Sequence, residues 1–230
     1  MIHLLLAVLA MTATPGSTSA QGPALFNVRC SSCHGLALQG SPNGPPLVGI
    51  SADHVDFALR TGRMPAAVPG LQSLQKQPLF DDGQIRSIVR YVVSAGHGDS
   101  RLPQVAPGNI GRGRAVFAQS CQACHGVTAE GASVGYAIVA PSLMNAQSEQ
   151  IAEAVRIGPG QMPKFGTDVL SARDVDDIVS YIVFLQTRRN AYNPGGLQLA
   201  NIGPVAEGFV AWAFGLGLLV LFVRKIGSTD

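Results

Sequence analysis

The sequence predicts an all-α protein made of two similar lobes in tandem, followed by one transmembrane helix. Three observations predict this class: an internal repeat, helical spacing of apolar residues, and a long apolar run near the C-terminus. Apolar residues recur at i, i+3, i+4 and i+7 within residues 85–92 and again within 175–182, which is the period of an α-helix. The Gly- and Pro-rich segments between such elements, for example residues 40–46, lack the alternation typical of strands.

The repeat has three parts, which occur in the same order in both halves. A Phe-x-x-x-Cys-x-x-Cys-His-Gly segment beginning at Phe26 returns at Phe117, 91 residues later. Residues 60–65 are echoed by 156–163, and 85–92 by 175–182. This order indicates a tandem duplication of one small domain. The predicted boundaries are residues 22–98 for the first domain, 99–110 for a linker, 111–190 for the second domain, 191–203 for a second linker and 204–226 for the membrane helix.

Each lobe of about 80 residues is too small to build much of a hydrophobic core by itself. A large apolar cofactor would supply the missing centre. Short helices are expected over residues 27–34 and 113–125, with amphipathic helices over 54–61 and 150–157. Asp82 and Ser171 are the expected N-caps of the last helix in each lobe.

All four cysteines of the chain fall in two Cys-x-x-Cys-His motifs, Cys30-x-x-Cys33-His34 and Cys121-x-x-Cys124-His125. This motif is typical of c-type haem attachment. The two thiols add across the vinyl groups of haem and form thioethers, while the histidine, one helical turn after the first cysteine, faces the iron. The motifs therefore predict two covalently bound haem c groups with His34 and His125 as proximal iron ligands.

Two other uses of such cysteines fit less well. A structural zinc site needs four ligands, and each lobe offers two cysteines and one histidine. A thioredoxin-like redox pair requires a βαβ context, which the sequence does not indicate.

The second iron ligand follows by elimination. After removal of an N-terminal signal, the methionines are Met64, Met144 and Met162. Met64 and Met162 both precede proline at the repeated position, whereas Met144 does not, and proline restricts the preceding backbone toward extended forms. Met64 and Met162 are therefore the predicted ligands. Core packing is the alternative role for a methionine, and His54 or His97 is the rival ligand in the first lobe.

Ligation by histidine and methionine raises the reduction potential of haem iron. It also fills both axial positions, so that dioxygen and substrates do not readily reach the metal. This ligation favours electron transfer over catalysis at the iron, with no side-chain catalysis expected in this chain.

The two ends of the chain predict its topology. Residues 2–11 form a short apolar run followed by small residues up to Ala20, as in a secretory signal that is either cleaved there or retained. Residues 204–226 are long enough to cross a bilayer, and Arg224 and Lys225 at their end favour a cytoplasmic C-terminus. The chain should thus be a single-pass protein of the cytoplasmic membrane with its haem domains on the extracytoplasmic side.

The overall composition agrees with a membrane-anchored cofactor protein. Charged residues make up 13% of the chain, against about 25% in ordinary soluble proteins. The net charge is +2 and no run is rich in Lys or Arg, so nothing indicates nucleic-acid binding.

Four segments and the tail resemble one family over residues 27–228. They are Cys30-Ser-Ser-Cys33-His34-Gly35, Arg60-Thr-Gly-Arg-Met64-Pro65-Ala66, Cys121-Gln-Ala-Cys124-His125-Gly126, Arg156-Ile-Gly-Pro-Gly-Gln-Met162-Pro163, and Asn193-Pro194-Gly195-Gly196 followed by Gly203-Pro204-Val-Ala-Glu207-Gly208 and Trp212. The chain resembles the dihaem cytochrome c subunit of the actinobacterial-type cytochrome bcc complex, a quinol–cytochrome c reductase. The tail is the most specific part, because haem motifs alone match many cytochromes.

The resemblance implies two tandem cytochrome c-like haem domains and a role as the electron-transfer subunit of a quinol–cytochrome c oxidoreductase, a translocase. It implies a cytochrome b subunit and a Rieske iron–sulfur protein as partners, with a haem–copper oxidase or soluble cytochrome as acceptor. The alternative is the dihaem cytochrome c subunit of a periplasmic dehydrogenase or of an oxidase. A dihaem peroxidase is a third hypothesis, and it would require one displaceable iron ligand.

Overall fold

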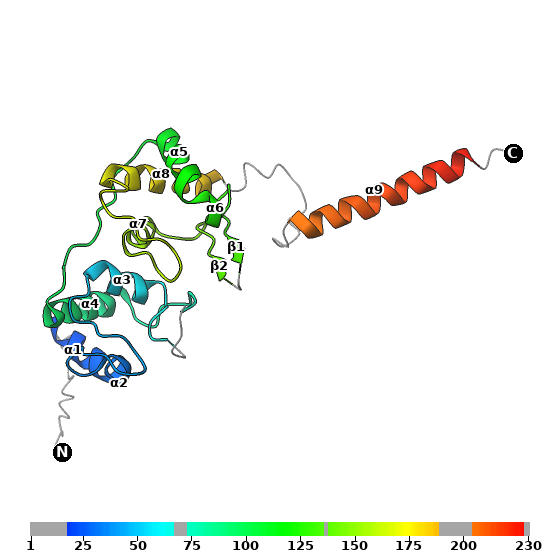
Figure 1. The fold of residues 1–230 in the computed structure, drawn as a ribbon. Coiled ribbons are helices and arrows are strands. Elements are labelled where there is room, and N and C mark those ends of the chain that lie inside the picture. Colours follow the sequence, from blue (N-terminus) through cyan, green and yellow to red (C-terminus); the bar gives the residue numbers. More distant parts are fainter. Residues whose placement is uncertain (1–17, 67–72, 136–137, 189–203, 228–230) are drawn as a thin grey trace, which may run out of the picture. The chain divides into compact units, whose positions relative to one another are not determined.

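The structure is a computed structural model that describes residues 18–66, 73–135, 138–188 and 204–227. It divides into two compact units, residues 1–187 and 188–230, whose elements are labelled in Figure 1. The predicted signal segment 1–20 lies outside the described residues except for its last three, which begin the first helix. The predicted second linker, residues 191–203, also lies outside them.

The first unit contains two helical lobes with separate cores. The first lobe comprises α1 (Thr18–Arg29), α2 (Ser31–His34), α3 (Ala52–Arg60) and α4 (Asp82–Gly96). The second lobe comprises α5 (Ile110–Ser120), α6 (Gln122–His125), α7 (Ser148–Ile157) and α8 (Ala172–Arg188). Each lobe buries its own hydrophobic cluster, so the duplication read from the sequence is a duplication of structure.

In both lobes the first helix crosses the last one at a glycine. A Cβ added to Gly22 on α1 would overlap the carbonyl oxygen of Ser87 on α4. In the second lobe, a Cβ on Gly113 of α5 would overlap the carbonyl oxygen of Asp177 on α8. Only glycine therefore allows the two backbones to approach this closely.

An aromatic pair lies beside each crossing. The ring centroids of Phe26 and Tyr91 are 5.4 Å apart with the rings tilted by 57°, and those of Phe117 and Tyr181 are 5.5 Å apart at 58°. Tilted pairs at this separation add to the stabilisation from apolar burial. The phenylalanine that precedes each Cys-x-x-Cys-His motif is thus the anchor that holds the motif against the last helix of its lobe.

Substituting Gly113 by alanine should lower the free energy of unfolding of the haem-loaded chain by about 1–3 kcal/mol, the usual cost of overpacking. Gly111→Ala is a matched control in the same helix, because its Cβ would lie 3.4 Å from the nearest atom, Oδ1 of Asn109. This exposed change should be neutral or stabilising by up to about 1 kcal/mol. Chemical denaturation of the two variants checks the difference, and equal stabilities would contradict the close crossing.

The segment predicted as the first linker, residues 99–110, is partly fastened to the second lobe. The amides of Ala106, Gly108 and Asn109 donate to side chains of α8, with donor–acceptor distances of 3.0, 2.8 and 2.6 Å. The last of these acceptors is Asp177, which also pairs with Arg112. Helix α5 begins at Ile110, the final residue of the predicted linker.

Several element predictions were wrong in detail. Asp81, not Asp82, is the N-cap of α4, because Gln84 lies at the third helical position and completes a capping box with it. In the second lobe, Ser171 does cap α8: its hydroxyl accepts from the amide of Asp174, and the Asp174 carboxylate accepts from the amide of Ser171. Helices α3 and α7 begin two residues before their predicted starts, while α1 begins nine residues before its own.

The second lobe also contains two short strands that the sequence did not predict. They are β1 (Ala132–Gly135) and β2 (Ile138–Ala140), which pair antiparallel. The two strands are mostly exposed, and Gly131 just before β1 and Gly135 at its end have φ +84° and +97°. Without a buried face, the hairpin lacks the alternating pattern that identifies a strand in a sequence.

The second unit contains α9 (Pro204–Ile226). Its residues 208–226 form a helix that is long and apolar enough to cross a membrane, and their side chains are exposed in the structure. The helix lies over the residues predicted as the anchor. The basic residues Arg224 and Lys225 are in its last turn.

Candidate haem sites

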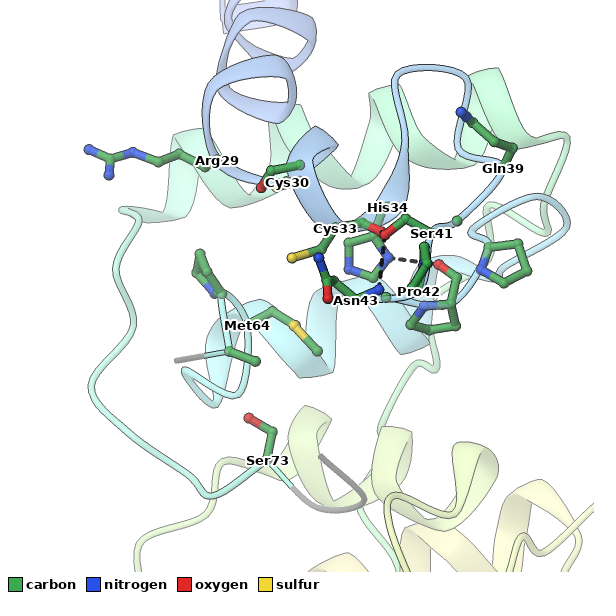
Figure 2. A pocket seen from close by; sticks show the side chains of 17 residues that line it. Arg29, Cys30, Cys33, His34, Gln39, Ser41, Pro42, Asn43, Met64 and Ser73 are labelled. Atoms are coloured by element: carbon green, nitrogen blue, oxygen red, sulfur yellow. Dashed lines mark hydrogen bonds between the residues drawn. The ribbon is translucent and has the colours of Figure 1, made fainter. Parts of the chain in front are cut away.

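The first Cys-x-x-Cys-His motif borders a cavity of about 730 Å³, a size typical of ligand sites. Cys30 lines it from the junction of α1 and α2, Cys33 and His34 from α2, and Met64 from the segment after α3. Figure 2 shows the imidazole of His34 and the thioether of Met64 within this space, with both cysteines beside it. The structure thus brings all four predicted site residues of the first lobe together.

Each motif lies at a break between two helices. Cys30 has φ −122° and ψ −33°, which ends α1 and starts α2, and Cys121 repeats the break with φ −124° and ψ −36°. The turn nevertheless continues, because the amide of His34 donates to the carbonyl of Cys30 at 2.9 Å, and that of His125 to Cys121 at 2.9 Å. First cysteine and histidine therefore remain on one side of the chain, as the motif predicted.

Each motif histidine is oriented by a backbone carbonyl that was not predicted from the sequence. Nδ1 of His34 is 2.8 Å from the carbonyl oxygen of Pro45, and Nδ1 of His125 is 3.0 Å from that of Pro141. A carbonyl can only accept, so Nδ1 carries the proton and Nε2 keeps its lone pair for a metal. The repeated pair Pro45-x-Leu47 and Pro141-x-Leu143 was the sequence signal for these partners.

The same backbone course connects motif and proline in both lobes. The glycine after each histidine has φ +76°, and the amides of Gly40 and Gly131 donate to the carbonyls of His34 and His125 at 2.8 and 2.9 Å. The amide of Leu47 donates to Leu38 at 2.8 Å, as that of Leu143 does to Ala129 at 2.8 Å. The two sites are therefore built by one repeated loop.

The first cysteine of each motif is poorly suited to thiolate chemistry. Burial, and then the neighbouring Cys33, raises the pKa of the Cys30 thiol to about 11. Burial, followed by Cys124, likewise raises the pKa of Cys121 to about 11. Reactive and metal-binding cysteines have lowered pKa values instead, so the raised values disfavour a redox or zinc-binding role for these thiols.

The side chains of Met64, Met144 and Met162 have different surroundings. The amide of Met64 donates to the carbonyl of Ala58 at 3.0 Å, which ties the residue back to α3. Met162 is half-buried and packs against the core of the second lobe, while Met144 is 7% exposed and is a member of that core. This placement favours a packing role for Met144 and leaves Met162 as the candidate ligand.

The rival histidines of the first lobe are engaged elsewhere. His54 lies at the start of α3, where Nδ1 is 3.0 Å from the hydroxyl of Ser51 and pairs with Asp53. His97 is the exposed C-cap of α4 with φ 56°. Neither histidine lines the cavity. The arrangement therefore favours Met64 as the second iron ligand, beside His34.

Comparisons with known proteins agree with this geometry. Residues 19–96 match the family model "Cytochrome c" and residues 108–182 the model "Cytochrome C oxidase, cbb3-type, subunit III". The chain is 38% identical over 217 residues to the cytochrome bc1 complex cytochrome c subunit of Mycobacterium tuberculosis, strain H37Rv, covering 90% of this chain and 76% of that relative. This chain belongs to the family of cytochrome bc1 complex cytochrome c subunits.

Membership of this family confirms the resemblance read from the sequence. The family's subunit from Corynebacterium efficiens is 33% identical over 228 residues, covering 91% of this chain and 76% of that relative. By contrast, the cbb3-type cytochrome c oxidase subunit CcoP of Azospirillum sp. B510 matches at 30% over 132 residues, which is 51% of this chain and 42% of that protein. The oxidase or dehydrogenase subunit alternative is therefore not favoured.

The fold class is confirmed as well. The two family models cover the two lobes, and α9 supplies the one candidate membrane helix in the described part of the chain. The chain is a cytochrome c with a C-terminal apolar helix. Its cytochrome c domains imply covalently bound haem c.

Proposed function

We propose that this subunit binds one haem c in each domain and relays electrons from a Rieske iron–sulfur protein to a haem–copper oxidase or soluble cytochrome. A cytochrome b subunit would be its membrane partner, and quinol chemistry would belong to that partner. The observation that carries the proposal is the convergence of Cys30, Cys33, His34 and Met64 on one cavity. Two thiols, one imidazole and one thioether are the donor set that a His/Met-ligated haem c requires.

The site residues would hold the cofactor in two ways, by covalent attachment and by ligation of the iron. Cys30 and Cys33 would anchor it covalently in the first domain, and Cys121 and Cys124 in the second. His34 with Met64 in the first domain, and His125 with Met162 in the second, would ligate the iron. The bound group supplies a one-electron carrier with a raised reduction potential, and the proline carbonyl behind each histidine keeps the imidazole in the required tautomer.

Anchoring through α9 would hold the relay at the membrane. We assign the haem domains to the extracytoplasmic side and the C-terminus to the cytoplasm, because Arg224 and Lys225 follow the apolar segment of α9. The segment 1–20 would then serve as the export signal.

Purification of the tagged full-length chain from its native membrane tests the assignment. We expect a cytochrome b subunit and a Rieske protein to be identified by mass analysis in the same preparation, together with oxidation of quinol by that preparation. Co-purification with a dehydrogenase, or with neither partner, would contradict the proposed complex. Covalent haem on the denatured chain, read from the same gel, tests cofactor attachment separately.

Gly215→Leu should weaken assembly with the cytochrome b subunit. Gly208, Ala211 and Gly215 recur at helical spacing on α9, and small residues let membrane helices approach closely. We expect at least a several-fold loss of co-purifying cytochrome b from detergent extracts.

Gly217→Leu is the matched control for that experiment. It adds the same side chain about 200° away around the helix, at 100° per residue, and should leave co-purification intact. Equal recovery of the partner with both variants would place the helix contact elsewhere.

A further inference from the structure

The two lobes meet where α3 packs against α7, and this contact buries two carboxyl groups. Asp56 on α3 is 3% exposed and Glu153 on α7 is 1% exposed. The two carboxyl groups interact with each other although they belong to different lobes. The two acids therefore lie on the helix faces that are directed toward the other lobe.

Asp56 has a cationic partner, and Glu153 has none of its own. Nε of Arg60 donates to Oδ2 of Asp56 at 2.6 Å, while Nη1 of Arg60 donates to Oδ1 of Asp82 at 2.6 Å. Glu153 lies beside the carboxyl group of Asp56, and Oε2 of Glu153 is buried without a hydrogen-bond partner. Two carboxylates cannot hydrogen-bond to each other unless one of them holds a proton.

The surrounding charges also favour a neutral Glu153. Burial, and then Asp56, raises the pKa of Glu153 to about 9, with Asp53 adding to the rise and Arg60 opposing it. Asp53 is itself paired with His54.

Other charged groups nearby are directed elsewhere. On α7, Glu149 is exposed, and Arg156 donates to the carbonyls of Phe165 and Leu170 at 3.1 and 2.6 Å. Arg63, after α3, lies 4.8 Å above the ring of Phe57. Among the described residues, Arg60 is thus the cation that faces Glu153, and it already serves two aspartates.

We propose that one proton shared by Glu153 and Asp56 closes the contact between the two lobes, and that Glu153 is a positioning residue for the electron step between the two haems. The first part stands on this chain's own residues. The second part rests on the proposed function, because it requires a haem in each lobe. In this arrangement the distance between the two haem sites depends on a protonation equilibrium.

The sign of the pH dependence follows from linkage. Glu153 has an ordinary pKa of 4.5 and a pKa of about 9 in the closed contact, so closed lobes bind a proton that separated lobes release. The stabilisation is fully present below about pH 4.5 and is lost as the pH rises toward 9. Within that window the ratio of closed to open lobes falls by up to about tenfold for each pH unit.

Infrared spectroscopy of the haem-loaded full chain in detergent tests the shared proton. The wild type should show the carbonyl band of a protonated carboxyl group at pH 7, and the band should disappear with a midpoint near pH 9. Glu153→Gln should remove this band at every pH, while Glu149→Gln, an exposed acid on the same helix, should retain it. A band that survives in Glu153→Gln, or that is absent from the wild type at pH 7, overturns the proposal.

Electron exchange between the haems after pulsed reduction tests the positioning role. The wild-type rate should fall as the pH rises toward 9, whereas Glu153→Gln should hold its rate within about twofold, because its amide donates to Asp56 without titrating. Glu153→Ala should be slow at every pH. An equal pH slope in the wild type and Glu153→Gln overturns this role.

Haem content keeps the two proposals distinguishable. Two haems per chain in every variant would allow the kinetic comparison to decide the positioning role. Fewer than two haems in the wild type would refute the proposed relay, while the infrared result would still decide whether Glu153 and Asp56 share a proton.

Discussion

Replacing both Cys121 and Cys124 by alanine should leave a chain with one covalent haem instead of two. The thioether bonds of the second lobe would be lost, while the cavity formed by Cys30, Cys33, His34 and Met64 would be untouched. The haem absorbance of the denatured and washed chain, divided by protein concentration, should fall by half. Intact mass should show the loss of one haem.

Two companion variants control this experiment. Cys30→Ala with Cys33→Ala should halve the haem content in the same way, because the two motifs are built by the same loop. Ser32→Ala lies within the first motif, at a position that carries no thiol, and should keep both haems. A double-cysteine variant that still holds two haems after denaturation would refute attachment through these thiols.

Met162→His should lower the reduction potential of one haem by on the order of 0.1–0.2 V, a fraction of the roughly 0.8 V over which axial ligands tune haem. Imidazole stabilises the oxidised iron relative to thioether sulfur. Redox titration followed in the visible spectrum should show one of two components shifting while the other stays in place. The sulfur-to-iron absorption of one haem should disappear with it.

Met144→Leu is the control for this ligand assignment. Met144 is 7% exposed within the core of the second lobe, so a volume-conserving change should cost less than about 1.5 kcal/mol of stability. Both potentials should stay where they are. If Met144→Leu shifted a potential and Met162→His did not, the two methionines would have to exchange their roles.

The sequence by itself determined the class of cofactor chemistry and the repeated plan of the chain. Both depend on short-range patterns along the sequence. These are the spacing of Cys30, Cys33 and His34, the return of this spacing at Cys121, and the helical period of apolar residues. The long apolar run of α9 is of the same kind, because a bilayer imposes a length and a composition that a sequence displays directly. Such features depend on neighbours a few residues apart, so they could be predicted without tertiary contacts.

The first and last residues of the helices were harder to predict, because neighbouring residues can be equally good N-caps. Asp81 and Asp82 are both good capping residues, and the choice between them depended on Gln84 reaching back to the Asp81 amide. The hairpin formed by β1 and β2 escaped prediction because exposed strands need no alternating pattern. Weak local preferences decide such details, and several of them are close in free energy.

Only the tertiary structure decided which distant residues meet. The carbonyls of Pro45 and Pro141 accept hydrogen bonds from the motif histidines. Met144 packs in the core of the second lobe, and Gly113 allows α5 to approach α8 closely. Above all, Asp56 and Glu153 look like ordinary surface acids on amphipathic helices until α3 packs against α7. Their burial results from the docking of two lobes, an effect of the whole fold that no pattern along the chain records.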